Sequence, residues 1–102
     1  MDVPEKWRGY ECDDYFRSPL AEHGWWDEDS QYWYIEPVQN LREDIAREFL
    51  VIGGPGVDGI DWGYRKGHPG VWAFHPIEEE FVRLAGSASE LREGYLSGSI
   101  KV

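Results

Sequence analysis

Residues 49–64 read FLVIGGPGVDGIDWGY, and the strongest local signals in the chain lie in this stretch. Residues 49–53 form an apolar run of strand length, and residues 55–59, PGVDG, contain two turn dipeptides. Residues 60–64, IDWGY, alternate large apolar side chains with Asp or Gly, which is typical of a strand with one buried face. The stretch therefore predicts two strands of a hairpin joined by a glycine-rich turn.

The same turn, Gly54 to Gly59, matches the Gly-x-Gly-x-x-Gly pattern of dinucleotide-binding loops. Such a loop must lead into a helix whose N-terminus faces the pyrophosphate. A strand-like alternation follows here instead, and a chain of 102 residues is too short for a doubly wound domain. We interpret the glycines as turn residues, since glycine adopts positive φ angles readily.

The segment before this hairpin predicts a strand and then a helix. Residues 31–36, QYWYIE, alternate in the manner of a strand, and Pro37 closes it. Residues 7–16 are ambiguous because Gly9 interrupts any helix, and residues 18–24 are loop-like. Apolar residues at spacings of three and four predict an amphipathic helix of about three turns from Val38, Leu41, Ile45 and Phe49.

Beyond the hairpin, residues 66–70 predict a turn and residues 71–75 a third strand, which Pro76 ends. Residues 77–85 fit either a strand or a helix. Ser87 and Glu90 have capping-box spacing, so a short helix is expected to begin there and to stop at Gly98.

The fold class expected is therefore α+β: an antiparallel meander sheet with an amphipathic helix before it and a short C-terminal helix. Residues 1–102 are expected to form one domain, with an acidic and aromatic segment at 1–30 and a core at 31–102.

Composition limits the function. The net charge of -10 argues against a binder of nucleic acid or of anionic membranes, both of which need basic surfaces, and favours a basic partner. The lone cysteine, Cys12, excludes an intramolecular disulfide. No apolar run reaches the roughly 18 residues of a membrane span, and the start lacks a signal-peptide core. We expect a soluble, cytoplasmic protein.

Residues 1–48 hold 13 acids against 5 bases, and nine of the 16 aromatic residues lie between Trp7 and Tyr34. Trp25 and Trp26 are adjacent on what looks like an irregular segment, which makes it hard for both to share one core. One interpretation places these rings in the core; the other makes some of them interface anchors, or stacking surfaces for a sugar. The candidate binding residues are Trp25, Trp26, Asp27, Glu28, Asp29, Tyr32 and Tyr34.

No catalytic residue, metal site or cofactor is predicted. The acidic runs 27–29 and 78–80 lack the spacing of calcium ligands and are interpreted as solvated faces. The histidines have no second ligand at metal-binding spacing: His23, His68 and His75. Two acids follow Cys12, which disfavours a reactive thiolate.

From Tyr32 to Leu96 the chain resembles the SUKH superfamily, the Smi/Knr-like domains. The resemblance rests on a Phe-Leu-x-Ile-Gly-type strand, a Gly/Asp-rich turn and two later motifs: residues 49–53, Gly56, Asp58-Gly59, Gly70-Val71-Trp72 and Leu84-Ala85-Gly86-Ser87. Ala88 and Leu91 stand where the family's last helix usually shows aromatic residues, and its N-terminal helix is not evident.

The resemblance implies a protein-binding module that is not an enzyme. Many bacterial members of the family look like immunity proteins that neutralise secreted toxins, often nucleases. The expected function is occlusion of a basic toxin domain, since an acidic inhibitor gains both steering and affinity from opposite charge. A regulatory or scaffold domain is the alternative, and a small sugar-binding domain or an enzyme is a third. The sequence leaves open the partner's identity and the oligomeric state.

Overall fold

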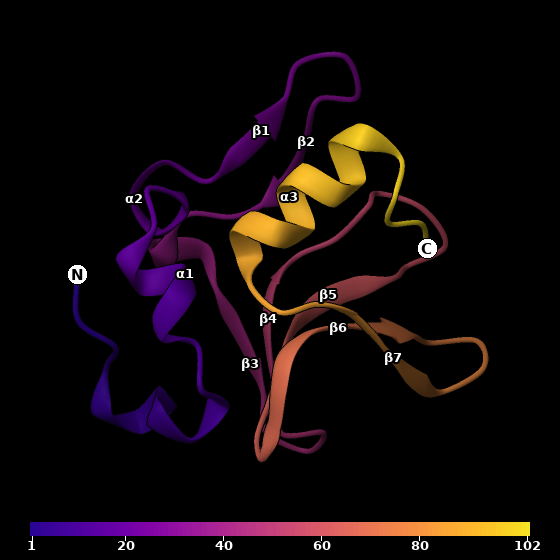
Figure 1. The fold of residues 1–102 in the computed structure, drawn as a ribbon. Coiled ribbons are helices and arrows are strands. Elements are labelled where there is room, and N and C mark those ends of the chain that lie inside the picture. Colours follow the sequence, from indigo (N-terminus) through magenta and orange to yellow (C-terminus); the bar gives the residue numbers. More distant parts are fainter.

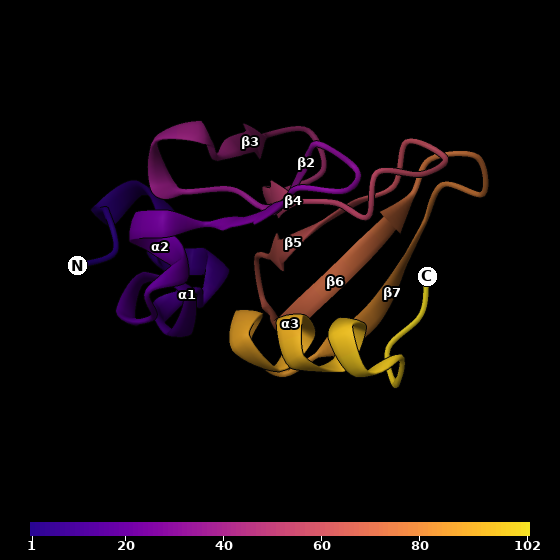
Figure 2. The same cartoon turned by 90° about the horizontal axis from the view of Figure 1, so that it is seen from above.

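The computed structural model describes all 102 residues and folds them as a seven-stranded antiparallel sheet with helices packed on one face (Figures 1 and 2). The helices are η1 (Glu5–Tyr10), α1 (Asp13–Arg17), α2 (Leu20–His23), η2 (Val38–Asn40) and α3 (Ala88–Ser97), where η marks 3-10 helices. The strands are β1 (Trp25–Asp27), β2 (Tyr32–Ile35), β3 (Arg42–Asp44), β4 (Phe49–Gly53), β5 (Asp61–Arg65), β6 (His68–His75) and β7 (Glu80–Ala85).

The strand order is β1-β2-β4-β5-β6-β7, and every pairing is antiparallel. β3 also pairs with β4, opposite residues 49–51, whereas β2 meets β4 at Gly53. β5 pairs with one edge of β4. The strands β2 and β3 therefore share the opposite edge of β4, one after the other, and η2 connects them. The α+β class and the antiparallel meander are confirmed.

The predicted amphipathic helix before the sheet is wrong. Its span contains η2, β3, a turn and the start of β4, and Ile45 is 77% exposed. The turn is fastened by Asp44, whose carboxylate accepts hydrogen bonds from the backbone N–H (3.2 Å) and the guanidinium (2.8 Å) of Arg47. Glu48 has a φ of 51°, which no helix residue adopts.

The helical spacing was misleading because its apolar members serve different clusters. Val38 and Leu41 pack against the main core, whereas Phe49 belongs to a second cluster with Val51 and Phe74. Pairing with β4 gives the backbone of residues 42–44 its hydrogen-bond partners, so tertiary structure overrides the local pattern.

The other expectations have mixed outcomes. β4 and β5 form as predicted, β6 begins at His68 inside the expected turn, and residues 80–85 of the ambiguous segment are a strand. α3 starts as expected, since the Ser87 hydroxyl accepts from the backbone N–H of Glu90 (3.1 Å), and it ends at Gly98 in the left-handed conformation.

Two predictions in the N-terminal third are wrong. Residues 20–23 of the expected loop form the short helix α2, and Trp25 and Trp26 lie on a strand rather than an irregular segment. Gly24, which joins α2 to β1, has a φ of 66°, and a Cβ there would lie 2.7 Å from the carbonyl oxygen of Ile35. The chain can therefore turn sharply from α2 into β1 only because this residue is glycine.

The main core lies between the helices and one face of the sheet. Its sheet side comes from alternate residues of β4 and β5: Leu50, Ile52, Trp62 and Tyr64. Its helical side consists of Leu91 on α3 and of N-terminal aromatic residues, which are thereby placed in the core: Tyr10, Tyr15 and Phe16. A Cβ at Gly63 would lie 1.9 Å from the carbonyl oxygen of Leu50, so this glycine permits the close approach of β4 and β5.

Two carboxylates tie the N-terminal helices to the sheet. Asp14 on α1 accepts hydrogen bonds from the hydroxyl of buried Tyr64 (2.7 Å) and from the backbone N–H of Ala88 (2.8 Å), the first residue of α3. Glu43 on β3 accepts from the indole N–H of Trp7 (3.1 Å) and the hydroxyl of Tyr10 (2.8 Å). Each carboxylate satisfies two donors from other parts of the chain.

Replacing Asp14 with Ala should lower the free energy of unfolding by about 2–4 kcal/mol, because a buried hydroxyl and a helix N-terminal N–H lose their acceptor. Asp13→Ala is the matched control, since Asp13 is exposed and makes no side-chain hydrogen bond; we expect a change within about 0.5 kcal/mol. Urea unfolding measures both, and equal losses would contradict the role assigned to Asp14.

Stability should fall in acid partly through Glu43. The hydrogen bonds from Tyr10 and Trp7 lower the pKa of this carboxyl in the folded state. Its ionised form therefore stabilises the fold above its unfolded pKa of about 4.3, and that contribution disappears as pH falls through the lowered folded pKa.

The variant Glu43→Gln should consequently lose less stability than the wild type between about pH 5 and pH 3 in urea unfolding. Glu5→Gln changes an exposed carboxyl that makes no hydrogen bond, so its free energy of unfolding should change with pH as steeply as that of the wild type. If the free energy of unfolding of Glu43→Gln fell with pH as steeply as that of the wild type, Glu43 would not be a source of this pH dependence.

Candidate functional site

The candidate binding residues lie on one hairpin, formed by β1 and β2, which extends beyond α3 at the top of Figure 1. Its turn is fastened by its own polar side chains. The carboxylate of Asp27 accepts from the backbone N–H of Ser30 (2.9 Å), and the Gln31 side chain donates to the carbonyl of Glu28 (2.9 Å). Hydrogen bonds from Ser30 lower the pKa of Asp27, so this charge persists well into acid.

The three carboxylates of this hairpin therefore have different roles. Asp27 shapes the turn, whereas the side chains of Glu28 and Asp29 are exposed at its tip. Only Asp27 accepts a hydrogen bond from a backbone N–H of the turn, so Glu28 and Asp29 can be altered without removing that bond.

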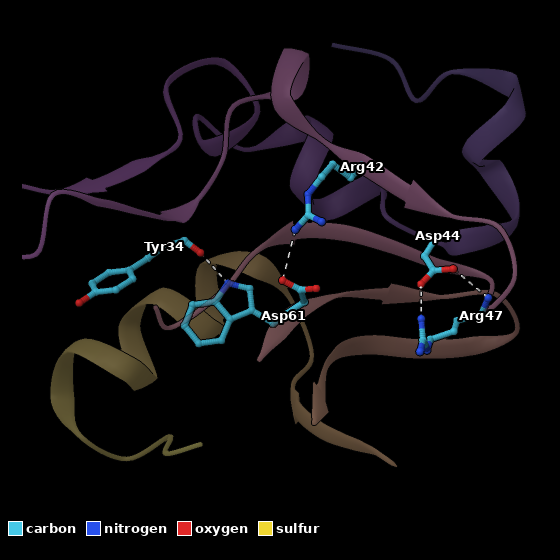
Figure 3. A network of polar contacts seen from close by, with 6 residues as sticks. Tyr34, Arg42, Asp44, Arg47 and Asp61 are labelled. Atoms are coloured by element: carbon cyan, nitrogen blue, oxygen red, sulfur yellow. Dashed lines mark hydrogen bonds and ion pairs between the residues drawn. The ribbon is translucent and has the colours of Figure 1, made fainter. Parts of the chain in front are cut away.

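The inner side of the hairpin is held by aromatic rings that pack edge to face. Trp25 and Tyr34 contact each other edge to face (5.0 Å between centroids), and both contact Tyr95 on α3 (6.1 and 5.5 Å). Tyr95 in turn lies against buried Trp62 (5.3 Å), whose indole N–H donates to the carbonyl oxygen of Tyr34 (Figure 3). Trp25 and Tyr34 are thus half-buried supports of the hairpin.

The outer side of the hairpin presents rings to solvent. Trp26 pairs with Trp33 across the two strands, and their rings meet edge to face at 5.2 Å. The Trp26 side chain is 37% exposed, which is high for so large an apolar residue. Tyr32, next to Trp33 on β2, points to the other face with Tyr34, whose ring centroid lies 6.3 Å away, and it is 41% exposed there. Adjacent residues of a strand point to opposite faces, so Trp25 packs toward the core and Trp26 is available for an interface.

A groove runs beside these outer rings. It has a volume of about 240 Å³ and is walled by Trp26, Tyr32 and Trp33, with Glu36 and Arg42 also lining it. Burial raises the pKa of the Glu36 carboxyl; the nearby Arg42 guanidinium lowers it and Asp61 raises it further. Figure 3 shows Arg42 reaching Asp61, and the nitrogen–oxygen distance is 3.2 Å.

The sequence analysis missed Trp33, Glu36 and Arg42 as members of this site. Glu36 is the last residue of the predicted strand 31–36 and precedes Pro37, which gave no sign of a groove. Arg42 was assigned to a helix that does not form, so its proximity to Asp61, 19 residues away, could not be anticipated.

The remaining titratable candidates are dispersed. Cys12 is buried, and this burial, with smaller effects from Asp13 and Asp14, raises its thiol pKa to about 12. The His68 ring contacts the Trp72 ring edge to face, and no group of three or more His, Cys, Asp or Glu side chains is arranged to hold a metal ion.

Comparison with protein-family models, curated proteins and solved structures found no match for this chain. Every helix falls short of the length and apolar character that crossing a bilayer requires.

The two adjacent tryptophans should differ in their contribution to stability. Trp25→Ala removes a ring packed on Tyr34 and Tyr95 and should cost about 2–3 kcal/mol of unfolding free energy. Trp26→Ala removes an exposed ring with one aromatic neighbour and should cost about 1 kcal/mol or less. Chemical denaturation checks both values, and the reverse order would contradict the division of the hairpin into inner and outer sides.

Proposed function

We propose that the protein is a non-enzymatic binding module of the immunity type, which occludes a basic bacterial toxin domain with the outer side of its β1–β2 hairpin. The observation that supports this most directly is the combination, on one hairpin, of exposed rings and exposed carboxylates. The resemblance of residues 32–96 to SUKH domains points in the same direction. The encounter would take place in the cytoplasm.

The rings provide the apolar part of such an interface. Trp and Tyr are enriched among the residues that contribute most to protein–protein binding, because a large flat side chain buries much area with little loss of freedom. Trp26 already rests against Trp33, and the strands beneath are held by the stacking of Trp25 and Tyr34 on Tyr95. The outer rings are therefore fixed before a partner arrives, which reduces the entropy lost on binding.

The carboxylates provide the electrostatic part. Glu28 and Asp29 are exposed at the tip of the turn, and the whole chain carries a net charge of -10. A toxin that grips nucleic acid must be basic to neutralise phosphates. Opposite charge accelerates the encounter of two such proteins and disfavours acidic competitors.

The decisive experiment reverses charge at the hairpin tip in the full chain. With the product of the neighbouring gene as the candidate toxin, Glu28→Lys/Asp29→Lys should slow association with its basic domain by about tenfold or more and abolish growth rescue on co-expression. Asp27 is left intact because it holds the turn.

Glu78→Lys/Glu80→Lys is the matched control, since it reverses two exposed carboxylates of the β6–β7 turn and β7. We expect this control to retain rescue. Rescue by both variants would contradict the hairpin tip as the docking surface. Absence of any binding to the toxin domain would contradict the immunity proposal and favour the regulatory or scaffold alternative.

Association should also depend on salt. Raising ionic strength from about 0.05 to about 0.5 M should lower the association rate markedly and change the dissociation rate less, because exposed charges are screened beyond about 10 Å at 0.1 M. Stopped-flow measurement of both rates tests this, and an association rate that is independent of salt would contradict electrostatic steering.

A further inference from the structure

We propose that the groove beside Trp26 and Trp33 receives one arginine side chain of the protein partner, which stacks on one of these rings and pairs with the carboxylate of Glu36. The inference rests on the proposed function in that it takes the partner to be a basic protein. It adds the specific chemical group that the partner inserts and the residue that recognises it.

The charges lining the groove and next to it are unbalanced. Two carboxylates, Glu36 and Asp61, lie near a single guanidinium, that of Arg42. Arg42 is committed to Asp61 by a hydrogen bond of 3.2 Å (Figure 3), whereas the Glu36 side chain has no hydrogen bond or ion pair. One further cation would bring each carboxylate a guanidinium partner.

The position of Glu36 makes such a cation valuable. The residue is half-buried next to aromatic walls, and this burial raises the pKa of its carboxyl in spite of the neighbouring Arg42. A charge that has lost part of its water gains more from a direct partner than an exposed charge does. The backbone carbonyl of Glu36 is bound by the Tyr15 hydroxyl (2.6 Å), which fixes this residue against the core.

The rings supply the second part of the recognition. The faces of tryptophan rings attract cations, and arginine is the cation most often found there. Cations already lie over rings within this chain: Arg65 lies 4.7 Å from the centre of the Trp72 ring, Arg47 lies 4.5 Å from that of Phe74, and Lys6 lies 4.8 Å from that of Trp7. Trp26 and Trp33 have no cation over them.

The size and shape of the groove favour an arginine over a larger ligand. Its volume of about 240 Å³ lies below the range of about 300–1,000 Å³ typical of small-molecule pockets, so a single side chain is the appropriate occupant. A planar guanidinium can stack on a ring and present two N–H groups to a carboxylate at the same time, which the compact ammonium of lysine cannot do.

The test uses a probe that needs no toxin: N-acetyl-arginine amide, titrated into the full chain and followed by the NMR signals of the indole N–H groups. We expect the signals of Trp26 and Trp33 to shift with a dissociation constant on the order of 10 mM, as suits one side chain binding alone. The Trp62 signal should stay in place, because that indole N–H is bonded to the Tyr34 carbonyl.

Two matched comparisons decide the chemistry. N-acetyl-citrulline amide, which has nearly the same shape without the charge, and N-acetyl-lysine amide should each bind at least about fivefold more weakly. Glu36→Gln should weaken arginine binding about tenfold, whereas Glu78→Gln in the exposed β6–β7 turn should leave it unchanged. Equal binding of citrulline or lysine, or of the Glu36→Gln variant, would overturn the assignment. So would shifts of the same indoles by methyl glucoside but not by the arginine probe.

The outcome is separable from that of the proposed function. Arginine binding in the groove by a chain that binds no toxin domain would defeat the immunity proposal and support the groove assignment. Toxin binding that is sensitive to Glu28→Lys/Asp29→Lys but unchanged in Glu36→Gln would support the immunity proposal and defeat the groove assignment.

Discussion

The carboxylate of Asp14 joins three parts of the fold that are far apart in sequence. It accepts the hydroxyl hydrogen of Tyr64 from the centre of the sheet and the first N–H of α3, while its own helix carries the aromatic residues of the N-terminal core. Negative charge at a helix N-terminus is stabilising, and an acceptor is needed there because the first N–H groups of a helix have no partner within it. The placement of α3 on the sheet thus depends on a residue 74 positions earlier.

The β1–β2 hairpin, the candidate binding site, depends on this arrangement indirectly. Because α3 is fixed at its start, Tyr95 near its end lies against Trp62 and supports Trp25 and Tyr34. A two-stranded hairpin is only marginally stable by itself, and here the inner rings supply the packing that it lacks. The outer side is left free to expose large apolar surface. Neighbouring residues on opposite faces of one short strand therefore serve folding on one side and form the proposed binding surface on the other.

The successes and failures of the sequence analysis follow from the range of the interactions involved. The strand at 49–53, the turn after it and the capped helix at 87–98 were predictable because the deciding groups lie within a few residues of each other. The helix expected from Val38 to Phe49 failed because β4 offers residues 42–44 a strand partner, which no local pattern reveals. The candidate site was found in part: its rings and acids are conspicuous in composition, whereas Glu36 and Arg42 are not.

The amino-acid sequence by itself determined the α+β class, the antiparallel meander, the acidic character and the segment in which exposed rings and carboxylates occur together. Alternation, turn residues and net charge suffice for these, since each is a local or additive property. Only the tertiary structure decided which tryptophan faces the core, that Asp27 belongs to the turn rather than to a free acidic surface, and that Glu36 lies in a groove with Arg42 and Asp61 close by. These depend on strand register and on contacts between distant residues, which are fixed only when the whole core packs.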